Sequence, residues 1–308
     1  MNINRALRSD RLMKGVTGMS VNEFQHLTED FERNFEKEKQ SKYKKGLKKG
    51  KRERKPGGGR KGKMETMYDK LFFILFYFKC YPTFDVMGFI FDIDRSNSCR
   101  NVHNLIPLLE MTLGETMVLP KRKIHTTKEL FEMFPEVRDL FIDATERQIP
   151  RPKDKDKQKK NYSGKKKRHT KKNTVITDED RQIRYLGPTV EGKKHDYGGF
   201  KDEFPTVPPP KLPDDFWIWT DLGYVGIEKD FPELNVMMPK KKPKGGELTE
   251  DEKVVNKWIS SVRVKVEHAI GGVKRFRIVS DIFRNKTDEM DDKVMEISCG
   301  LWNYHLSC

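Results

Sequence analysis

The chain has 308 residues, of which 35% are hydrophobic and 35% are charged, and it carries a net charge of +15. The length predicts two domains, and the low apolar fraction predicts that part of the chain is solvated loop or tail. The longest apolar run, residues 71–78, is far too short to cross a bilayer, which argues against a membrane protein.

The positive charge is concentrated in two short segments. Residues 41–63 contain 12 basic residues and one acid, and residues 151–172 contain 12 basic residues and two acids. Together the two segments carry +21, which leaves the rest of the chain at −6. Dense basic segments on an otherwise acidic chain indicate a polyanionic partner, with nucleic acid the leading candidate, although lysine runs also promote solubility.

The four cysteines, Cys80, Cys99, Cys299 and Cys308, form no CxxC pair and lack the spacing of a zinc site. The N-terminal segment has no apolar core of the kind found in signal peptides. We therefore expect a reduced, intracellular protein.

The first predicted element is a helix, because residues 19–35 place apolar side chains at helical spacing. Ser20 is its expected N-cap, and Glu23 completes a capping box. Residues 55–63 follow, with three consecutive glycines after a proline, and they cannot form a helix interior. This segment is either a solvated hinge or a basic arm that lies in a DNA minor groove.

Residues 64–114 predict three helices, of which the second begins after Thr83 and the third at Ser96. Two short helices joined by a tight turn after a supporting helix follow the helix-turn-helix plan, although an ordinary three-helix bundle shares this pattern. The adjacent basic segment favours the DNA-binding interpretation. The third helix would then be the recognition helix, and its candidate DNA contacts are Ser96, Asn97, Ser98, Arg100, Asn101 and His103.

The second half of the chain changes character from helices to strands. Strands are predicted over residues 140–149, 166–180, 181–190 and 216–227. A helix is predicted over residues 249–275, broken near Gly271 and Gly272, and further helix follows to Tyr304. This order of elements predicts an α/β core. We expect four segments: an N-terminal tail, helix and Gly-rich linker (1–63), a helix-turn-helix domain (64–118), a linker (119–135) and the α/β domain (136–308).

Three acids stand out by their positions in this domain. Asp143 lies within the first strand, Asp221 ends a later apolar strand, and Glu267 lies on the following helix. One acid in an apolar run is usually structural, because burying it without a partner is costly. Two such acids on different strands, with a third on a helix, make an oxygen site for Mg²⁺ or Mn²⁺. Two such ions could activate a nucleophile and stabilise the leaving oxygen in phosphodiester cleavage.

The motifs at residues 141–149, 162–170, 219–226 and 263–276 together resemble the DDE transposases of bacterial insertion sequences, specifically the group named after insertion sequence five, and the related domesticated Harbinger-type nucleases. The similarity extends to the helix-turn-helix segment and covers roughly residues 16–305. The last motif is similar to the Tyr-Arg-Glu-Lys signature of this family. Arg263, Glu267 and Lys274 match it, whereas Ser260 stands in place of the tyrosine.

The resemblance implies a ribonuclease-H-like catalytic core preceded by an all-α helix-turn-helix domain. It implies that Asp143, Asp221 and Glu267 hold the metal, Mg²⁺ or Mn²⁺, as two ions. Arg263 and Lys274 would orient Glu267 or contact DNA phosphates. The alternative for this helix is an exposed ion pair worth about 0.3–0.5 kcal/mol.

The implied activity is that of a transposase, which binds terminal inverted repeats and catalyses metal-dependent DNA strand cleavage and strand transfer. Its partners would be double-stranded DNA and a second copy of the chain, in the cytoplasm of a prokaryote in association with the nucleoid. The phosphate backbone would be contacted by Lys165, Lys166, Lys167 and Arg168. The alternatives are a non-catalytic or domesticated sequence-specific DNA-binding protein and a nuclease without joining activity.

Several other residues carry further predictions. The pair His195–Asp196 either approaches the acids or orders its own loop, and loop ordering is favoured. His169 either contacts a phosphate or is simply exposed. Asp154 and Asp156 alternate with lysines and are expected to be solvated. The tryptophans are expected in the core: Trp217, Trp219 and Trp258.

Overall fold

The computed structural model describes residues 3–50, 62–124, 132–204, 215–232, 234–287 and 289–308, together with residues 126 and 129. The chain forms two compact units. The first comprises Met1–Leu119, Arg275–Ile278 and Tyr304–Cys308, and the second comprises Pro120–Lys274 and Val279–Asn303. Most of the predicted Gly-rich segment, residues 55–61, lies outside the described residues.

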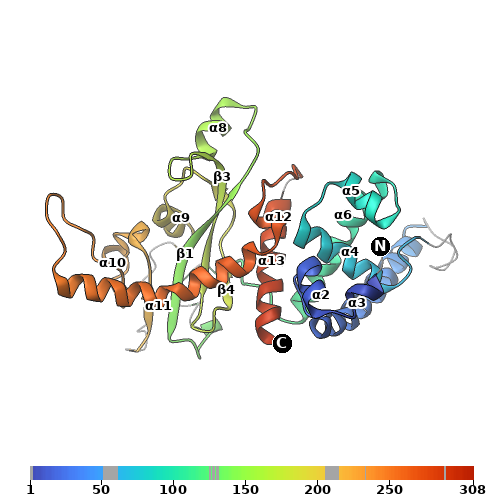
Figure 1. The fold of residues 1–308 in the computed structure, drawn as a ribbon, viewed down its shortest axis with the longest axis horizontal. Coiled ribbons are helices and arrows are strands. Elements are labelled where there is room, and N and C mark those ends of the chain that lie inside the picture. Colours follow the sequence, from blue (N-terminus) through green and yellow to red (C-terminus); the bar gives the residue numbers. More distant parts are fainter. Residues whose placement is uncertain are drawn as a thin grey trace. The chain divides into compact units, whose positions relative to one another are not determined.

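The first unit is helical (Figure 1). Ser20 and Glu23 form the predicted capping box at the start of α3. This helix is longer than predicted and continues to Lys48, because lysine, leucine and glutamine are good helix formers and no glycine-rich stretch intervenes. The helices of the unit are α1 (Ile3–Ala6), α2 (Asp10–Thr17), α3 (Val21–Lys48), α4 (Met67–Cys80), α5 (Phe84–Phe91) and α6 (Arg95–Glu115).

The predicted helix-turn-helix is confirmed as α4, α5 and α6. Thr83 caps α5 as predicted, and α6 begins one residue before the predicted start. Asp92 ends α5 in the left-handed conformation, with φ of 53°. The turn then packs tightly on α5, since a Cβ at Gly88 would lie 2.5 Å from the carbonyl oxygen of Ile93.

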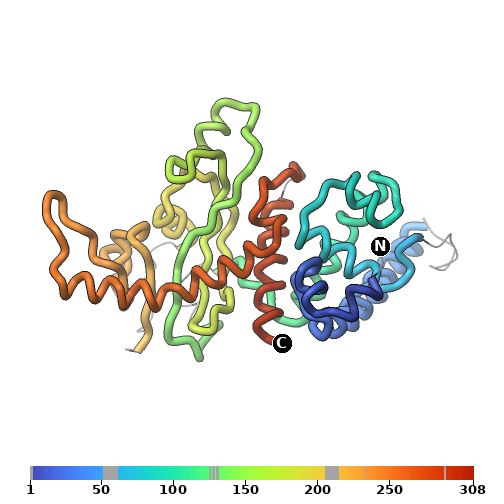
Figure 2. Tube along the Cα trace, in the orientation of Figure 1, coloured from blue at the N-terminus to red at the C-terminus, as the bar shows by residue number. Residues whose placement is uncertain are grey.

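The second unit contains a mixed β-sheet. Its path runs β2-β3-β1-β6-β7, and β4 and β5 also pair with β3. β1 is antiparallel to β3 and parallel to β6, and the long pair β1–β3 is visible in Figure 2. The strands are β1 (Asp139–Gln148), β2 (Tyr162–Ser163), β3 (Arg168–Thr177), β4 (Ile183–Leu186), β5 (Val190–Glu191), β6 (Trp217–Trp219) and β7 (Val236–Met237).

Helices cover both faces of this sheet. On one face, Phe141 and Trp219 pack against Ile259 and Val266 of α11. On the other face, Ile142 and Ile218 join a core that includes Phe200 and Phe204 from the region of α9. This arrangement confirms the predicted α/β class and is consistent with a ribonuclease-H-like core. The remaining helices are α8 (Lys155–Asn161), α9 (Asp196–Glu203), η1 (Leu222–Tyr224), α10 (Ile227–Asp230), α11 (Glu250–Lys274), α12 (Arg277–Ser280) and α13 (Met290–Ser307).

The predicted break in the long helix is wrong. α11 runs without interruption to Lys274, and Figure 1 shows it as one continuous orange helix. Gly272 is needed for packing, because a Cβ there would lie 2.3 Å from the indole of Trp302. Gly272 therefore allows α11 to approach Trp302 closely and does not break the helix. The local sequence does not reveal this contact. Residues 216–227 also differ from the prediction, since only Trp217–Trp219 are extended.

Candidate active site

Strand register brings Asp143 and Asp221 to the same level of the sheet. β1 and β6 are parallel neighbours, with Phe141 opposite Trp219. Asp143 lies on β1 two residues beyond Phe141, on the side of the sheet where Phe141 meets α11, and Asp221 lies two residues beyond Trp219, just past the end of β6. The topology therefore brings the two aspartates near one another, and the charge of Asp221 acts on Asp143.

Local hydrogen bonds fix both carboxyl groups. The backbone N–H of Ala144 donates to Asp143 Oδ1 at 2.7 Å. Asp221 precedes η1, and its Oδ1 accepts from the backbone N–H of Gly223 at 2.8 Å. Each carboxylate keeps a second oxygen for another partner.

Burial and, to a smaller extent, the neighbouring charge of Asp221 together raise the pKa of Asp143 to about 6, although the N–H of Ala144 and the guanidinium of Arg263 act in the opposite direction. Two carboxylates in a poorly hydrated site repel one another, and a cation relieves that repulsion. A perturbed acid beside a second acid is typical of functional sites. The chemistry of this pair fits a hard divalent cation.

Two basic side chains of α11 gather near Asp143. Lys274 has a lowered pKa, first because it is buried and then because Lys166 is near, while Asp143 and Glu146 act in the opposite direction. Arg263 is buried, and its Nε has no hydrogen-bond partner among the described residues. Both were predicted from their spacing around Glu267, and the structure places them within electrostatic range of Asp143.

Glu267 is not grouped with the two aspartates. It lies on α11, and its side chain is exposed. Within the part of the chain that the structure describes, no group of three or more His, Cys, Asp or Glu side chains is arranged to hold a metal ion. The structure thus brings together Asp143 and Asp221, and the role of Glu267 as third ligand stays a prediction.

A buried charge network beside the site was only partly anticipated. Lys172 Nζ donates to Asp196 Oδ1 at 2.9 Å and to the carbonyl of Lys194 at 3.0 Å, and it lies 3.5 Å from Glu146 Oε1. Asp196 opens α9, so the pair with Lys172 ties this helix to β3. Part of this network follows from the strand pairing, because the antiparallel register of β1 and β3 places Glu146 opposite Lys172.

Asp196 also lies beside Asp221. A Cβ at Gly223 would lie 2.7 Å from Asp221 Oδ1 and 3.4 Å from Asp196 Oδ2, so the absent side chain leaves room for both carboxylates. Loop ordering was the favoured prediction for His195–Asp196. The geometry shows both alternatives, because Asp196 orders its own segment through Lys172 and also lies close to the acid pair.

Sequence reasoning missed Tyr224. Its side chain is fully buried, and its hydroxyl has no hydrogen-bond partner among the described residues. Burial raises the pKa of this phenol, and the charges of Asp143, Asp196 and Asp221 raise it further. The hydroxyl is therefore a neutral donor held near three carboxylates. An unsatisfied buried hydroxyl is costly, so we expect this one to donate to a water molecule or another ligand.

The predicted recognition residues lie on the first turns of α6. Arg100 and Ser96 are exposed, whereas Asn97, Asn101 and His103 are partly exposed. Ser98 is fully buried, and its hydroxyl lies 3.2 Å from the carbonyl of Asp94, to which it donates. The prediction that Ser98 contacts DNA is therefore wrong, because its side chain faces the core of the unit.

The predicted phosphate contacts in the second unit are exposed. Lys165, Lys166 and Lys167 form the turn between β2 and β3, and Lys167 adopts a left-handed conformation with φ of 54°. Arg168 begins β3 and donates to Gln148 Oε1 at 2.9 Å, so it is held in place on the surface. These four cations form a compact basic turn.

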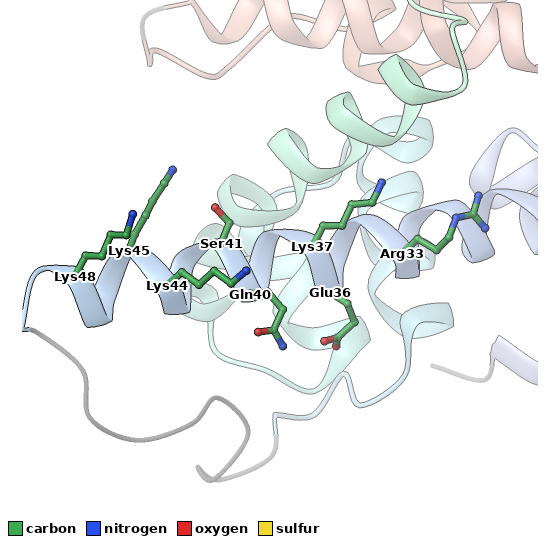
Figure 3. A pocket seen from close by; sticks show the side chains of 8 residues that line it. All are labelled: Arg33, Glu36, Lys37, Gln40, Ser41, Lys44, Lys45 and Lys48. Atoms are coloured by element: carbon green, nitrogen blue, oxygen red, sulfur yellow. The ribbon is translucent and has the colours of Figure 1, made fainter.

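The first basic segment begins on α3. Figure 3 shows Arg33, Lys37, Lys44, Lys45 and Lys48 along this helix, around a surface cavity of about 720 Å³. Arg33 pairs with Asp30, and Lys37 pairs with Glu115. The three C-terminal lysines form no ion pair within the described residues, which leaves their charge available to a polyanion.

The other residues singled out from the sequence lie partly in the core and partly at the surface. Trp219 packs in the core as expected, whereas Trp258 is 48% exposed and lies edge-on to Trp219. Asp154 is exposed and also caps α8, where its carboxylate accepts from the backbone N–H of Lys157 at 2.8 Å. All four cysteines are free. In the described part of the chain, no helix is both long enough and apolar enough to span a membrane.

Comparison with known proteins matches both units. Residues 142–303 match the family described as DDE superfamily endonuclease, and residues 62–115 match the helix-turn-helix of DDE superfamily endonuclease. The chain is 31% identical over 260 residues to the "Probable transposase for insertion sequence element IS702" of Microchaete diplosiphon, which covers 83% of this chain and 86% of that protein. No solved structure matches the chain. The chain therefore belongs to the DDE-superfamily transposases of insertion sequences.

Proposed function

We propose that this transposase binds the terminal inverted repeats of its own insertion sequence and catalyses metal-dependent DNA strand cleavage and strand transfer. The observation that carries the proposal is the placement of Asp143 and Asp221 at one level of adjacent parallel strands. Family membership adds an endonuclease domain and a helix-turn-helix in the same chain.

Enzymes of the DDE superfamily generally use divalent metals, and the acid pair fits one. In this proposal Asp143, Asp221 and Glu267 hold two Mg²⁺ or Mn²⁺ ions. A bound divalent ion supplies Lewis-acid activation of the phosphodiester and of the attacking water. Asp143 is mostly ionised above its pKa of about 6 and is then ready to coordinate a cation.

The basic side chains next to the acids position the DNA. Arg263 lies within electrostatic range of Asp143, and its guanidinium suits a phosphate oxygen, because charge-assisted hydrogen bonds are strong. Lys274 supplies a second positive charge near Asp143. Together they would hold the scissile phosphate during cleavage, before the freed 3′-hydroxyl attacks a phosphate of the target DNA.

Synapsis of two element ends requires two active sites, so we propose a homodimer on double-stranded DNA. The DNA substrate also underlies the proposed location, in the cytoplasm of a prokaryotic host in association with the nucleoid. The proposed homodimer and the proposed location both depend on the proposed cleavage and strand-transfer activity.

The joining of a cut element end to target DNA distinguishes a transposase from a nuclease. We would incubate the protein and Mg²⁺ with pre-cleaved element ends and a supercoiled plasmid, with a matched end that carries a 3′-dideoxy terminus. Plasmid-joined products that require the 3′-hydroxyl support strand transfer. Cleavage of uncut ends without joined products would identify a nuclease that does not join.

A further inference from the structure

A second candidate site lies in the endonuclease unit, apart from the acid pair. It is a surface pocket of about 690 Å³, bounded by α8, β2, β3 and the segment after β5. Its lining combines three cations, two aromatic rings and a glycine: Arg151, Lys159, Lys193, Tyr162, His169 and Gly164. No acidic side chain contributes to this lining, so the pocket is suited to an anionic ligand that also has a flat ring.

The aromatic wall of the pocket is preorganised. Tyr162 and His169 are directly opposite one another in the β2–β3 pair, and their ring centroids lie 5.6 Å apart in an edge-to-face arrangement. Tyr162 is nevertheless 43% exposed, so part of its ring faces solvent. Gly164 has open space where a Cβ would lie, which keeps the pocket accessible on that side.

The cationic wall is also held in place. Arg151 donates from Nε and Nη2 to Gln158 Oε1 at 3.2 and 3.0 Å, and Gln158 in turn donates to the carbonyl of Pro152 at 2.8 Å. This leaves other N–H groups of the guanidinium for a ligand. The backbone N–H of Lys193 donates to the carbonyl of Lys160 at 3.0 Å, which fixes Lys193 beside α8.

The pocket and Asp143 lie on the same pair of strands, since Asp143 of β1 is opposite Val175 of β3 and His169 of the pocket lies six residues before Val175. The turn that follows Tyr162 carries Lys166, and Lys166 lies within electrostatic range of Lys274. Lys274 in turn lies within electrostatic range of Asp143. A DNA strand that passes Asp143 and follows β3 towards its first residues would therefore reach this turn.

We propose that the pocket binds one unstacked nucleotide of the DNA substrate, with its base on Tyr162 and its phosphates on Arg151, Lys159 and Lys193. Base–aromatic stacking tolerates any sequence, and it adds to the electrostatic attraction of the backbone. This inference rests on the proposed function for the presence of DNA. The nucleotide comes either from a single-stranded end or from a base flipped out of the duplex.

The test compares two DNAs that carry the same inverted repeat, one fully paired and one with three unpaired nucleotides at its end. We would measure Kd by fluorescence anisotropy for Asp221→Asn protein, which prevents cleavage, with Tyr162 intact, as Tyr162→Phe or as Tyr162→Ala. With Tyr162 or Phe present, we expect about 10-fold tighter binding of the unpaired end, and we expect Ala to abolish this preference. A Lys165→Ala, Lys167→Ala double variant is the control, and it should weaken both DNAs equally.

A fluorescent 2-aminopurine distinguishes the two sources of the nucleotide. Quenching at an unpaired position indicates a single-stranded end, whereas a Tyr162-dependent change at a paired position indicates a flipped base. Either response supports the pocket. No loss of affinity for either DNA in Tyr162→Ala, or equal loss for both DNAs without any 2-aminopurine response, would overturn it. Wild-type cleavage without the preference would refute only the pocket, whereas the preference without cleavage would refute only the proposed activity.

Discussion

Asp143 and Glu203 hold protons more tightly in the folded protein than in the unfolded chain. Burial raises the pKa of Glu203 from 4.5 to about 7, although the hydroxyls of Thr174 and Tyr185 donate to its carboxylate. The unfolded chain releases this proton near pH 4.5, whereas the folded protein holds it up to about pH 7. The free energy of unfolding therefore falls as the pH rises from 4.5 to about 7. Burial likewise raises the pKa of Asp143, from 3.8 to about 6.

Replacing Glu203 by Gln should remove this effect. Because the amide cannot ionise and keeps one acceptor oxygen, we expect Glu203→Gln to raise the free energy of unfolding at pH 7.5 by about 1–3 kcal/mol. Near pH 4.5 the difference should fall below about 0.5 kcal/mol. Urea unfolding at both pH values measures it, with exposed Asp202→Asn as control. Equal destabilisation at both pH values would contradict the assignment.

Metal binding can be tested on Asp143 without DNA. We expect Asp143→Asn to melt at a higher temperature than wild type at pH 7.5 in EDTA, because a carboxylate is no longer ionised beside Asp221. Mn²⁺ should then raise the Tm of wild type and leave the variant unchanged, since a ligand stabilises only the state that binds it. Asp215→Asn, an exposed acid paired with Arg138, should behave as wild type. If Mn²⁺ raised the Tm of Asp143→Asn as much as that of wild type, the metal would bind elsewhere.

At the scale of elements, α6 separates residues that face solvent from residues that face the core. We expect Arg100→Ala to weaken binding of the inverted repeat by about 10-fold, because one good base contact is worth about 1–3 kcal/mol. Ser98→Ala is the matched control on the same turn, and it should leave DNA affinity unchanged and cost at most about 1 kcal/mol of stability. Electrophoretic mobility shifts measure both. A larger loss of affinity for Ser98→Ala than for Arg100→Ala would contradict the assignment of α6.

Two adjacent glycines of α11 should respond in opposite directions. Gly271 has open space where a Cβ would lie, so Gly271→Ala should stabilise by about 0.5–1 kcal/mol through helix propensity. Gly272→Ala should destabilise by about 1–3 kcal/mol, because its Cβ would overlap the indole of Trp302. Thermal melting of both variants provides the comparison. Stabilisation by both would mean that Trp302 moves aside without cost.

Some of these elements could be predicted from the sequence, and others could not. Local periodicity and caps predict α3, the helix-turn-helix and β1, because each depends on neighbouring residues. The pairing of Asp143 with Asp221 follows once β1 and β6 are taken as parallel neighbours. The proximity of Asp196, the orphan hydroxyl of Tyr224 and the contact at Gly272 depend on residues distant in sequence. No local pattern encodes these contacts.

For the whole molecule, positive charge is found in both units. The lysines of α3 belong to the helical unit, and the turn at Lys165, Lys166 and Lys167 belongs to the endonuclease unit. Both should contribute to backbone binding, so affinity for any DNA should fall steeply as salt rises. Sequence preference, in contrast, should depend on α6, and chemistry should depend on the acid pair.

The most direct test of the central claim is cleavage of a labelled duplex that carries the element's own ends, in Mg²⁺ or Mn²⁺, by wild type and by Asp221→Asn. We predict metal-dependent nicking at the ends by wild type and none by the variant, with similar DNA affinity for both. Tight binding of the ends by both proteins without cleavage by either would contradict the account. That result would identify a DNA-binding protein without catalysis.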